Sequence, residues 1–411
     1  MSRFFVSRER QRLTLCSRRQ VLGAVSLLMA MGILSRPCVR RRAFELFHWS
    51  HELTHLVLTV TTLWHATSAW QCVVRACVRA SRYSDGKLRT VARRYLLGGL
   101  VLWLVDHALR FSAVRRHVRV CSLDVEADGA VVCLGYECDV PGATAGAESE
   151  GPLAHAMGQF VFLQVPAIAT LEWHPFSISS APADMAPGDL LTTHHIRCVG
   201  DASFTGRLRA LARSIDGNGD ALASLIVNVD GPYGTPRAES FLALGAVDAG
   251  RAHHLLLIAG GIGVTPLHSA FRGLYHVAYR CQRLPAGYPQ TVCLVWASRD
   301  AALFRIADFV RTLDAIDEDS LGGRFSYTLH CTGHVDEEAP SATDRRRTRA
   351  PAVRARWTAG RPDVGALVRA FARRAGGAGR VCVCGPRSLA DACLEPCVEA
   401  GVELRRESFE I

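Results

Sequence analysis

The sequence contains no paired CxxC motifs, no secretory signal and no internal repeat. Its 15 cysteines are odd in number and scattered, so neither a structural zinc site nor a regular disulfide framework is indicated. We expect most of them to be reduced core residues facing a cytosolic environment. The first twenty residues are rich in Arg and Ser but lack the apolar core of a secretory signal. They are typical of an organelle transit peptide or of a basic loop beside a membrane helix.

Lysine is also scarce, and the net charge of +10 comes from Arg far more than from Lys. A basic balance of this kind suits nucleic acid, an anionic membrane surface or phosphorylated ligands, and charge alone does not choose among them. With 411 residues, 49% of them apolar, the chain is long enough for two or three domains, each with its own core. A single small fold is excluded.

Long apolar runs are few, and all lie before residue 115, at Val21–Leu34, Phe44–Trp70 and Tyr95–Phe111. A helix that crosses the hydrocarbon core needs about 20 mostly apolar residues, a length that the second run reaches. We therefore predict a partial α-helical membrane domain over residues 1–114, with buried helices of a soluble domain as the alternative. Arg clusters flank every run, so the positive-inside rule gives no orientation.

Beyond residue 115 the pattern changes to short β-like runs separated by Gly, Asp and Pro turns. This pattern predicts an antiparallel β-barrel over residues 115–240. From His254 apolar strands alternate with helices, which predicts a parallel sheet in an α/β domain over residues 250–411. Residues 333–351 are charged and poor in apolar side chains, so we predict a mobile surface insertion there.

One segment of the β domain, Gly158–Pro182, places hydroxyl side chains directly after an aromatic residue. A flavin ring lies against apolar or aromatic groups and takes a short hydrogen bond at N5, while its pyrophosphate takes backbone N–H groups and positive charge. The segment therefore predicts a flavin site, with an ordinary hairpin edge and a buried histidine as the alternative. The predicted contacts are His174, Phe176 and Ser177 at the ring and Ser179 and Ser180 near the phosphates.

Two glycine turns at strand ends are candidate anion sites. In HIRCVGDASFTGRL a strand turns into a helix start, where Gly200 and Thr205 are placed to meet a phosphate. In AGGIGVTP the bare backbone lets a pyrophosphate approach a helix that we expect to begin near Pro266, with Thr265 as a candidate cap. The predicted nucleotide contacts at this second turn are Gly260, Gly261, Gly263, Thr265 and Pro266. Between the two turns, VDGPYGTP predicts a tight turn that closes the β domain.

Residues that follow other strands are expected to lie beside the second glycine turn. Arg299 in WASRD and Arg361 in GRP are candidate cations for the ribose phosphate that distinguishes NADPH from NADH, although a surface Arg is more often a solvated charge. Cys384–Pro386 follow another strand and let a nicotinamide come close to the chain. Phe409 suits a lid over the flavin, with a frayed terminus as the alternative.

The order of these motifs is specific: LEWHPFSISSAP, VGD with a following T, VDGPYGTP, GGIGVTP, WASRD, GRP, CGP and a terminal ESF. In this order they resemble the ferric reductase and NADPH oxidase superfamily, over roughly residues 40–411. The resemblance implies a ferredoxin-reductase-like module with FAD and NADPH as cofactors. The FAD-binding residues that it implies are His174, Pro175, Phe176, Ser177 and Ser180. The NADPH-binding residues that it implies are Gly261, Gly263, Thr265, Pro266, Arg299, Arg361, Cys384, Gly385 and Pro386.

The resemblance extends to Phe44–His65, which is similar to the family helix that carries one axial ligand for each of two haems. His51 and His65 lie about 21 Å apart along such a helix and share one face, and they are the predicted haem ligands. No His precedes His48, so the second pair of a bis-histidine set is missing. We rank a truncated gene product first, ahead of ligands from a partner subunit and of a protein without haem.

By this resemblance the chain is an NADPH-dependent ferric-chelate reductase, multi-pass in the plasma membrane or an endomembrane, with cytosolic FAD and NADPH domains. Electrons would pass from NADPH through FAD, and through haem in intact relatives, to a ferric or other metal chelate. Ser177, Cys384 and Phe409 are expected nearest this transfer. The alternatives are a superoxide-producing NADPH oxidase, with dioxygen as acceptor, and a truncated non-catalytic membrane subunit. A partner subunit or self-association is expected besides the lipid membrane, and nucleic acid is not.

Overall fold

The computed structural model describes part of the chain and divides it into two compact units. The described residues are 22–23, 25–36, 47, 50–57, 101–102, 104–105, 116–139, 150–151, 153–170, 172–182, 191–234, 254–281, 283–284, 287–333 and 357–407. One unit comprises Met1–Ala113 with Glu410–Ile411, and the other comprises Val114–Phe409. The predicted insertion after Gly333, the ligand His65 and the lid residue Phe409 lie outside the described residues.

The N-terminal unit is described only in short helical pieces, which include residues 25–34 and 50–57. No helix within these described pieces has both the length and the apolar character needed to cross a membrane. His51 is exposed, and its ring centroid lies 5.3 Å from that of Phe47. Among the described residues, no three His, Cys, Asp or Glu side chains come together as a metal site.

The C-terminal unit begins with an antiparallel β domain. Its strands are β1 (Arg116–Glu126), β2 (Val131–Asp139), β3 (Glu150–Gly151), β4 (Phe160–Gln164), β5 (His174–Ser177), β6 (Thr192–Arg197) and β7 (Val227–Tyr233). They pair in the order β3-β2-β1-β7-β4-β5, with β6 on β2. The sheet curls toward closure, because the N–H of Ser179, just after β5, donates to Thr193 O on β6 at 2.9 Å. The predicted β-barrel is confirmed.

Alternation along β2 explains how this domain builds its core. Val132, Leu134 and Tyr136 are buried against the other strands and against helix α5 (Phe204–Ile215), as period-2 alternation requires. Val131, the first residue of β2, points to the opposite face and belongs to a different apolar cluster, that of the α/β domain. A 3-10 turn, η1 (Ala127–Gly129), and a short helix, α6 (Gly219–Ala223), complete the domain.

The rest of the unit is an α/β domain built on a parallel sheet. The strands are β8 (His254–Gly260), β9 (Thr291–Ser298), β10 (Phe325–Cys331), β11 (Trp357–Ala359), β12 (Gly379–Cys384) and β13 (Glu403–Glu407). The helices are η2 (Gly261–Gly263), α7 (Val264–Arg280), η3 (Ala301–Arg305), α8 (Ala307–Glu318), α9 (Val364–Ala375) and α10 (Arg387–Ala400). The strand order is β11-β10-β9-β8-β12-β13, and each pair is parallel. The predicted parallel sheet is confirmed.

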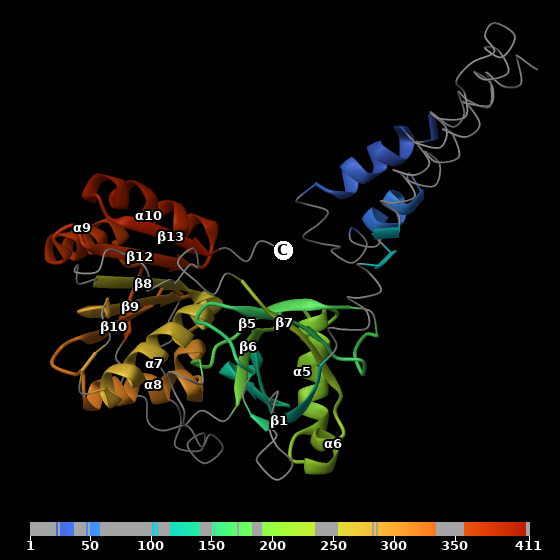
Figure 1. Cartoon of the computed structure of the whole chain (residues 1–411), viewed down its shortest axis with the longest axis horizontal. Coiled ribbons are helices and arrows are strands. Elements are labelled where there is room, and N and C mark those ends of the chain that lie inside the picture. Colours follow the sequence, from blue (N-terminus) through green and yellow to red (C-terminus); the bar gives the residue numbers. More distant parts are fainter. Residues whose placement is uncertain are drawn as a thin grey trace, which may run out of the picture. The chain divides into compact units, whose positions relative to one another are not determined.

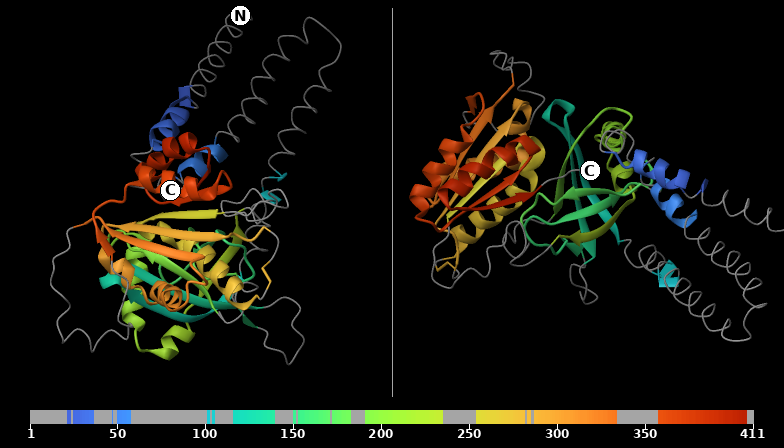
Figure 2. Two further views of the ribbon diagram at one scale, coloured as in Figure 1. Left: turned by 90° about the vertical axis from the view of Figure 1, so that its left-hand side faces the viewer. Right: turned by 90° about the horizontal axis from the view of Figure 1, so that it is seen from above.

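Both faces of this parallel sheet are covered by helices. Helices α7 and α8 lie on one face, and α9 and α10 lie on the other (Figures 1 and 2). A central strand buried on both faces reads as a continuous apolar run, which is why β8 has the sequence HLLLIAG. Figure 1 also shows the β domain beside the α7 and α8 face. Val131 of β2 packs there with Phe304 and Phe309 in one apolar cluster, so the two domains share a core.

Two local predictions were wrong. The segment VDGPYGTP was expected to be a turn, but residues up to Tyr233 form the end of β7, which pairs with β4. Pairing on the sheet overrides the local turn preference of Gly and Pro. Helix α7 begins at Val264 and has Gly263 as its N-cap, so Thr265 lies inside the first turn and is not the cap. Its hydroxyl donates to Ile262 O at 3.1 Å.

Candidate functional site

The predicted flavin segment, Gly158–Pro182, contains β4 and β5. The predicted ring contacts lie on β5, the last strand in the pairing order. His174, Pro175, Phe176 and Ser177 are all half-buried. The ring of His174 lies 4.2 Å from that of Phe204 at the start of α5, and Phe176 lies 6.2 Å from the same ring. Half-buried aromatic side chains on an edge strand form a surface on which a flat ring can stack.

The residues that follow β5 are buried and hydrogen-bonded within the protein. The hydroxyl of Ser179 lies 2.9 Å from Thr193 O, and the hydroxyl of Ser180 accepts from Thr193 N at 3.1 Å. Ser177 O accepts from Nδ1 of His194 at 2.8 Å. Burial lowers the pKa of His194 to about 3, so this imidazole is neutral. The contact of Ser179 and Ser180 with flavin phosphates stays a prediction.

The loop between β6 and α5 has the geometry of a helix N-terminus with a tight glycine turn. Ser203 is the N-cap, and its hydroxyl accepts from Gly206 N at 3.0 Å. The hydroxyl of Thr205 accepts from Val199 N at 3.0 Å. Gly200 has φ +69°, and a Cβ there would meet nothing within 4 Å. The backbone of the turn is therefore open beside the positive end of a helix.

Three glycines bring the ends of β8 and β12 into backbone contact. A Cβ on Gly260 would lie 2.6 Å from Pro386 Cδ, and one on Gly263 would lie 2.6 Å from Cys384 O. Gly385 has φ +151°, and its Cβ would lie 2.8 Å from Gly260 Cα. These positions are filled by the protein itself, so Gly260, Gly263 and Gly385 allow the two strand ends to pack closely.

Gly261 differs from these three because its surroundings are open. It has φ +56°, and the nearest atom to a Cβ there is Nη1 of Arg197, at 3.7 Å. The indole Nε1 of the buried Trp296 donates to Gly261 O at 2.9 Å and fixes the turn. An open glycine backbone beside a guanidinium is a site that a pyrophosphate fits.

Gly263→Ala tests the packing of these strand ends. We expect it to lower the free energy of unfolding by about 1–3 kcal/mol, because the new methyl group overlaps Cys384 O. Gly219→Ala, in helix α6 with no atom within 4 Å of the new methyl group, is the control and should be neutral or slightly stabilising. Thermal melts of the full chain compare the two, and equal midpoints would contradict the contact.

The predicted cations follow neighbouring strands. Arg299 follows β9 and Arg361 follows β11, on either side of β10, and both are exposed. Gly333 follows β10, and its Cβ would collide with Arg299 O, so glycine allows the two chain segments to meet. The carboxyl ends of parallel strands lie along one edge of a sheet, which places both guanidinium groups at the edge that carries the glycine turn.

Cys384, at the end of β12, is fully buried. Burial raises the pKa of its thiol, so the group is a protonated, packed side chain and not a nucleophilic thiolate. Its backbone carbonyl faces Gly263. Its contact with nicotinamide stays a prediction.

Sequence reasoning did not single out Arg197, Phe204 or Trp296. Arg197 ends β6, with only Cys198 between it and the VGD turn, and a cation at a strand end before a glycine turn is a signal that was available. Phe204 lies in the HIRCVGDASFTGRL segment as well. The bond from Trp296 to Gly261 joins two neighbouring strands, so only the sheet order reveals it.

Family models match both domains of the C-terminal unit. Residues 146–237 match an FAD-binding domain, and residues 252–398 match a ferric reductase NAD-binding domain. Together the matches cover more than half of the chain. The β domain is thus an FAD-binding domain, and the α/β domain is an NAD-binding domain.

Curated relatives fall into two groups. Ferric reduction oxidase 8, mitochondrial, of Arabidopsis thaliana is 28% identical over 62% of this chain and 28% of its own length. NADPH oxidase 3 of Rattus norvegicus is 33% identical over 45% of this chain and 30% of its own length. NADPH oxidase 5 of Homo sapiens is 26% identical over 92% of this chain and 50% of its own length. The chain thus spans between about a quarter and a half of these relatives.

A solved structure of the FAD/NAD-binding domain of a Vibrio cholerae nitric oxide dioxygenase is 15% identical, with a TM-score of 0.44, over 72% of this chain and 99% of that one. The family models and the curated relatives point to the same family. The chain therefore belongs to the ferric reductase and NADPH oxidase superfamily.

Proposed function

We propose that this chain takes electrons from NADPH, passes them to FAD and delivers them to a ferric or other metal chelate. The observation that carries the proposal is the meeting of Arg197, from the FAD-binding domain, with the open Gly261 turn of the NAD-binding domain. Bound FAD would supply the chemistry, by accepting a hydride from the nicotinamide and releasing its two electrons singly. The protein residues bind and orient the two cofactors.

Each part of the site suits one part of a cofactor. His174 and Phe176, backed by the buried Phe204, offer the surface for the flavin ring, with Ser177 as the hydrogen-bond partner of its N5 edge. The open turn at Gly200 and the start of α5 suit the FAD pyrophosphate, and the Gly261 turn suits that of the nucleotide. The burial of Val381–Cys384 leaves the backbone of Gly385 and Pro386 as the accessible end of β12.

NADPH is favoured over NADH because two guanidinium groups flank β10 at the nucleotide edge. We expect Arg299→Ala and Arg361→Ala each to lower the preference for NADPH over NADH by about 10- to 100-fold, since each removes a charge-assisted bond to the 2′-phosphate. The measurement is the rate of flavin reduction with each nucleotide. Arg305→Ala, an exposed guanidinium at the end of η3, is the control and should leave the preference unchanged. An unchanged preference in all three variants would contradict the assignment.

A superoxide-producing NADPH oxidase is the second candidate, because human NADPH oxidase 5 aligns with 92% of this chain. Dioxygen would then replace the metal chelate as acceptor. Oxygen consumption and Fe(III)-chelate reduction, measured side by side with NADPH, distinguish the two. Reduction of the chelate that persists without oxygen supports the reductase, whereas turnover that requires oxygen supports the oxidase.

We also propose that the protein associates with a membrane through its N-terminal unit, as the apolar runs before residue 115 predict. Of the two predicted haem ligands, the described residues include only His51, which is exposed. The described residues by themselves do not form a haem site, so we assign no electron-transfer step to haem. A partner subunit or a second copy as the source of further ligands stays a proposal.

A further inference from the structure

Ser179, two residues after β5, is contacted by histidines at its carbonyl oxygen and at its hydroxyl. Its carbonyl O accepts from Nδ1 of His268 on α7, at 3.0 Å, and its Oγ lies 2.6 Å from Nδ1 of His195 on β6. Ser179 is fully buried. Because its hydroxyl, its N–H and its carbonyl oxygen are all bonded within the protein, this arrangement holds the backbone in place.

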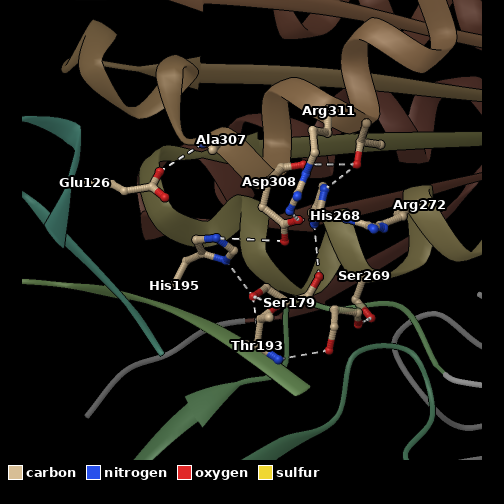
Figure 3. A network of polar contacts seen from close by, with 12 residues as sticks. Glu126, Ser179, Thr193, His195, His268, Ser269, Arg272, Ala307, Asp308 and Arg311 are labelled. Atoms are coloured by element: carbon tan, nitrogen blue, oxygen red, sulfur yellow. Dashed lines mark hydrogen bonds and ion pairs between the residues drawn. The ribbon is translucent and has the colours of Figure 1, made fainter. Parts of the chain in front are cut away.

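Helix α8 supports both histidines from the other side. The hydroxyl of Thr312 lies 2.9 Å from Nε2 of His268, and Oδ2 of Asp308 lies 4.0 Å from Nε2 of His195. Figure 3 shows both histidines pointing toward Ser179, with Asp308 beside them. The set that we name the serine clamp is Ser179, His195, His268, Asp308 and Thr312.

Asp308 is the charged centre of the clamp. Its carboxylate accepts from Nη1 of Arg272 at 2.8 Å and from Nη2 of Arg311 at 2.7 Å. Burial alone would raise the pKa of this carboxyl, but His268, His195, Arg272 and Arg311 hold it well below its ordinary value. The carboxylate is therefore ionised, and it fixes α7 to α8 through Arg272.

Two further bonds join the FAD-binding domain to the same helices. The hydroxyl of Ser269 donates to Ser180 O at 2.7 Å. Oε2 of Glu126 accepts from Ala307 N at 2.9 Å, the first N–H of α8, whose own N-cap residue offers no side-chain bond. The FAD-binding domain thus caps α8, and α7 holds two consecutive carbonyls of the flavin segment.

The path through these bonds is short. Helix α7 begins at Val264, directly after the glycine turn, and His268 and Ser269 lie little more than one turn further along. On the other side, Ser179 is two residues from Ser177, the predicted partner of the flavin. Buried hydrogen bonds from His268 and Ser269 therefore connect the start of α7, which follows the Gly261 turn, directly to Ser179 and Ser180.

We propose that His268 and Ser269 are positioning residues that fix the flavin segment against the helix of the nucleotide turn, and so align the two cofactor sites. The inference rests on the proposed function, because alignment matters only if NADPH reduces the flavin. A misplacement of about 1 Å between reacting groups can cost on the order of 100-fold in rate. Both residues act through the backbone that they hold, and neither is assigned a contact with a cofactor.

The test compares His268→Leu with His268→Asn in the full chain purified with FAD. Leucine removes both bonds of the imidazole, whereas the asparagine amide replaces the Nδ1–H that donates to Ser179 O. His276→Leu, on the same helix but outside the clamp, is the matched control. Two quantities are measured: the limiting rate of flavin reduction by NADPH without oxygen, and hydrogen exchange at the amides of Ile178 and Ser179, which bond to Gln159 O and Thr193 O.

We expect His268→Leu to lower the limiting rate at least 10-fold, with the half-saturating NADPH concentration changed by less than about 2-fold, and to speed exchange at both amides. His268→Asn should recover most of the rate and of the protection. Equal rates and equal exchange in the Leu variant and the parent would overturn the proposal. If the Leu variant does not fold or hold FAD, Ser269→Ala replaces it in the same two measurements, and parent-like values in that variant would overturn the proposal.

The outcomes also separate this inference from the proposed function. If NADPH leaves the flavin of the parent chain oxidised, the proposed function fails, and hydrogen exchange alone tests the clamp. Faster exchange in the Leu variant than in the Asn variant would then still support it. Identical exchange in both variants would overturn it.

Discussion

Acidification from pH 6 to pH 5 is expected to lower the free energy of unfolding of the C-terminal unit by about 3 kcal/mol. Burial lowers the pKa of His194 and His268 to about 3 and that of His195 to about 4, from an ordinary value of 6.5. Below pH 6.5 the unfolded chain binds a proton at each of these imidazoles, while the folded chain does not. As the pH falls, each imidazole therefore lowers the free energy of unfolding by up to about 1.4 kcal/mol per pH unit, until the pH reaches the pKa of that imidazole in the folded chain.

Carboxyl groups with shifted pKa values modify this pH dependence in opposite ways, as Glu126 and Asp308 illustrate. Burial raises the pKa of Glu126, so the folded chain binds a proton there first, and this offsets part of the loss. Because the pKa of Asp308 is lowered, this carboxyl group reduces the free energy of unfolding further only when the pH falls below the ordinary pKa of an aspartate. Melting temperatures of the full chain at pH 7, 6 and 5 measure the effect. His268→Asn should reduce the slope by about one third, and a flat profile from pH 6 to pH 5 would contradict neutral burial of these histidines.

Asp308→Asn is expected to lower the free energy of unfolding by about 3 kcal/mol or more. The Asp308 side chain is 13% exposed and that of Arg272 is 14% exposed, so their bond lies largely out of water. The substitution keeps the size of the side chain but removes the charge that Arg272 and Arg311 share. Losing one member of a buried ion pair costs far more than losing an exposed pair.

The matched control for this substitution lies on the same helix. Asp317 is exposed, and its carboxylate accepts from the Tyr327 hydroxyl at 2.6 Å. Asp317→Asn should change the free energy of unfolding by less than about 1 kcal/mol. Chemical denaturation with tryptophan fluorescence compares the two variants at neutral pH. Equal midpoints would show that the buried carboxylate of Asp308 does not stabilise the folded chain.

The fold of the C-terminal unit was largely predictable because its strands carry strong patterns. Val132, Leu134 and Tyr136 recur at every second position of β2 and pack in one apolar cluster, and Leu255–Ile258 is apolar throughout because β8 is covered on both faces. The end of β7 was missed because Gly231 and Pro232 favour a turn locally. Their strand character comes from pairing with β4, a contact across more than 60 residues of sequence.

The site was predictable only where it depends on local sequence. The open turns at Gly200 and Gly261 follow strands, and a strand, a glycine turn and a helix start can be read along the chain. The serine clamp was missed because His195, His268 and Asp308 come from three separate elements. A buried histidine has no periodic signature in the sequence, and its partners are known only once the two domains are packed together.

NADPH is expected to reduce FAD bound to this chain. The most direct test is the visible flavin spectrum of the purified full chain, recorded without oxygen before and after addition of NADPH, with NADH as the comparison. We predict that flavin is present and that NADPH bleaches it faster than NADH does. A chain that holds no flavin, or flavin that stays oxidised with excess NADPH, would contradict the claim.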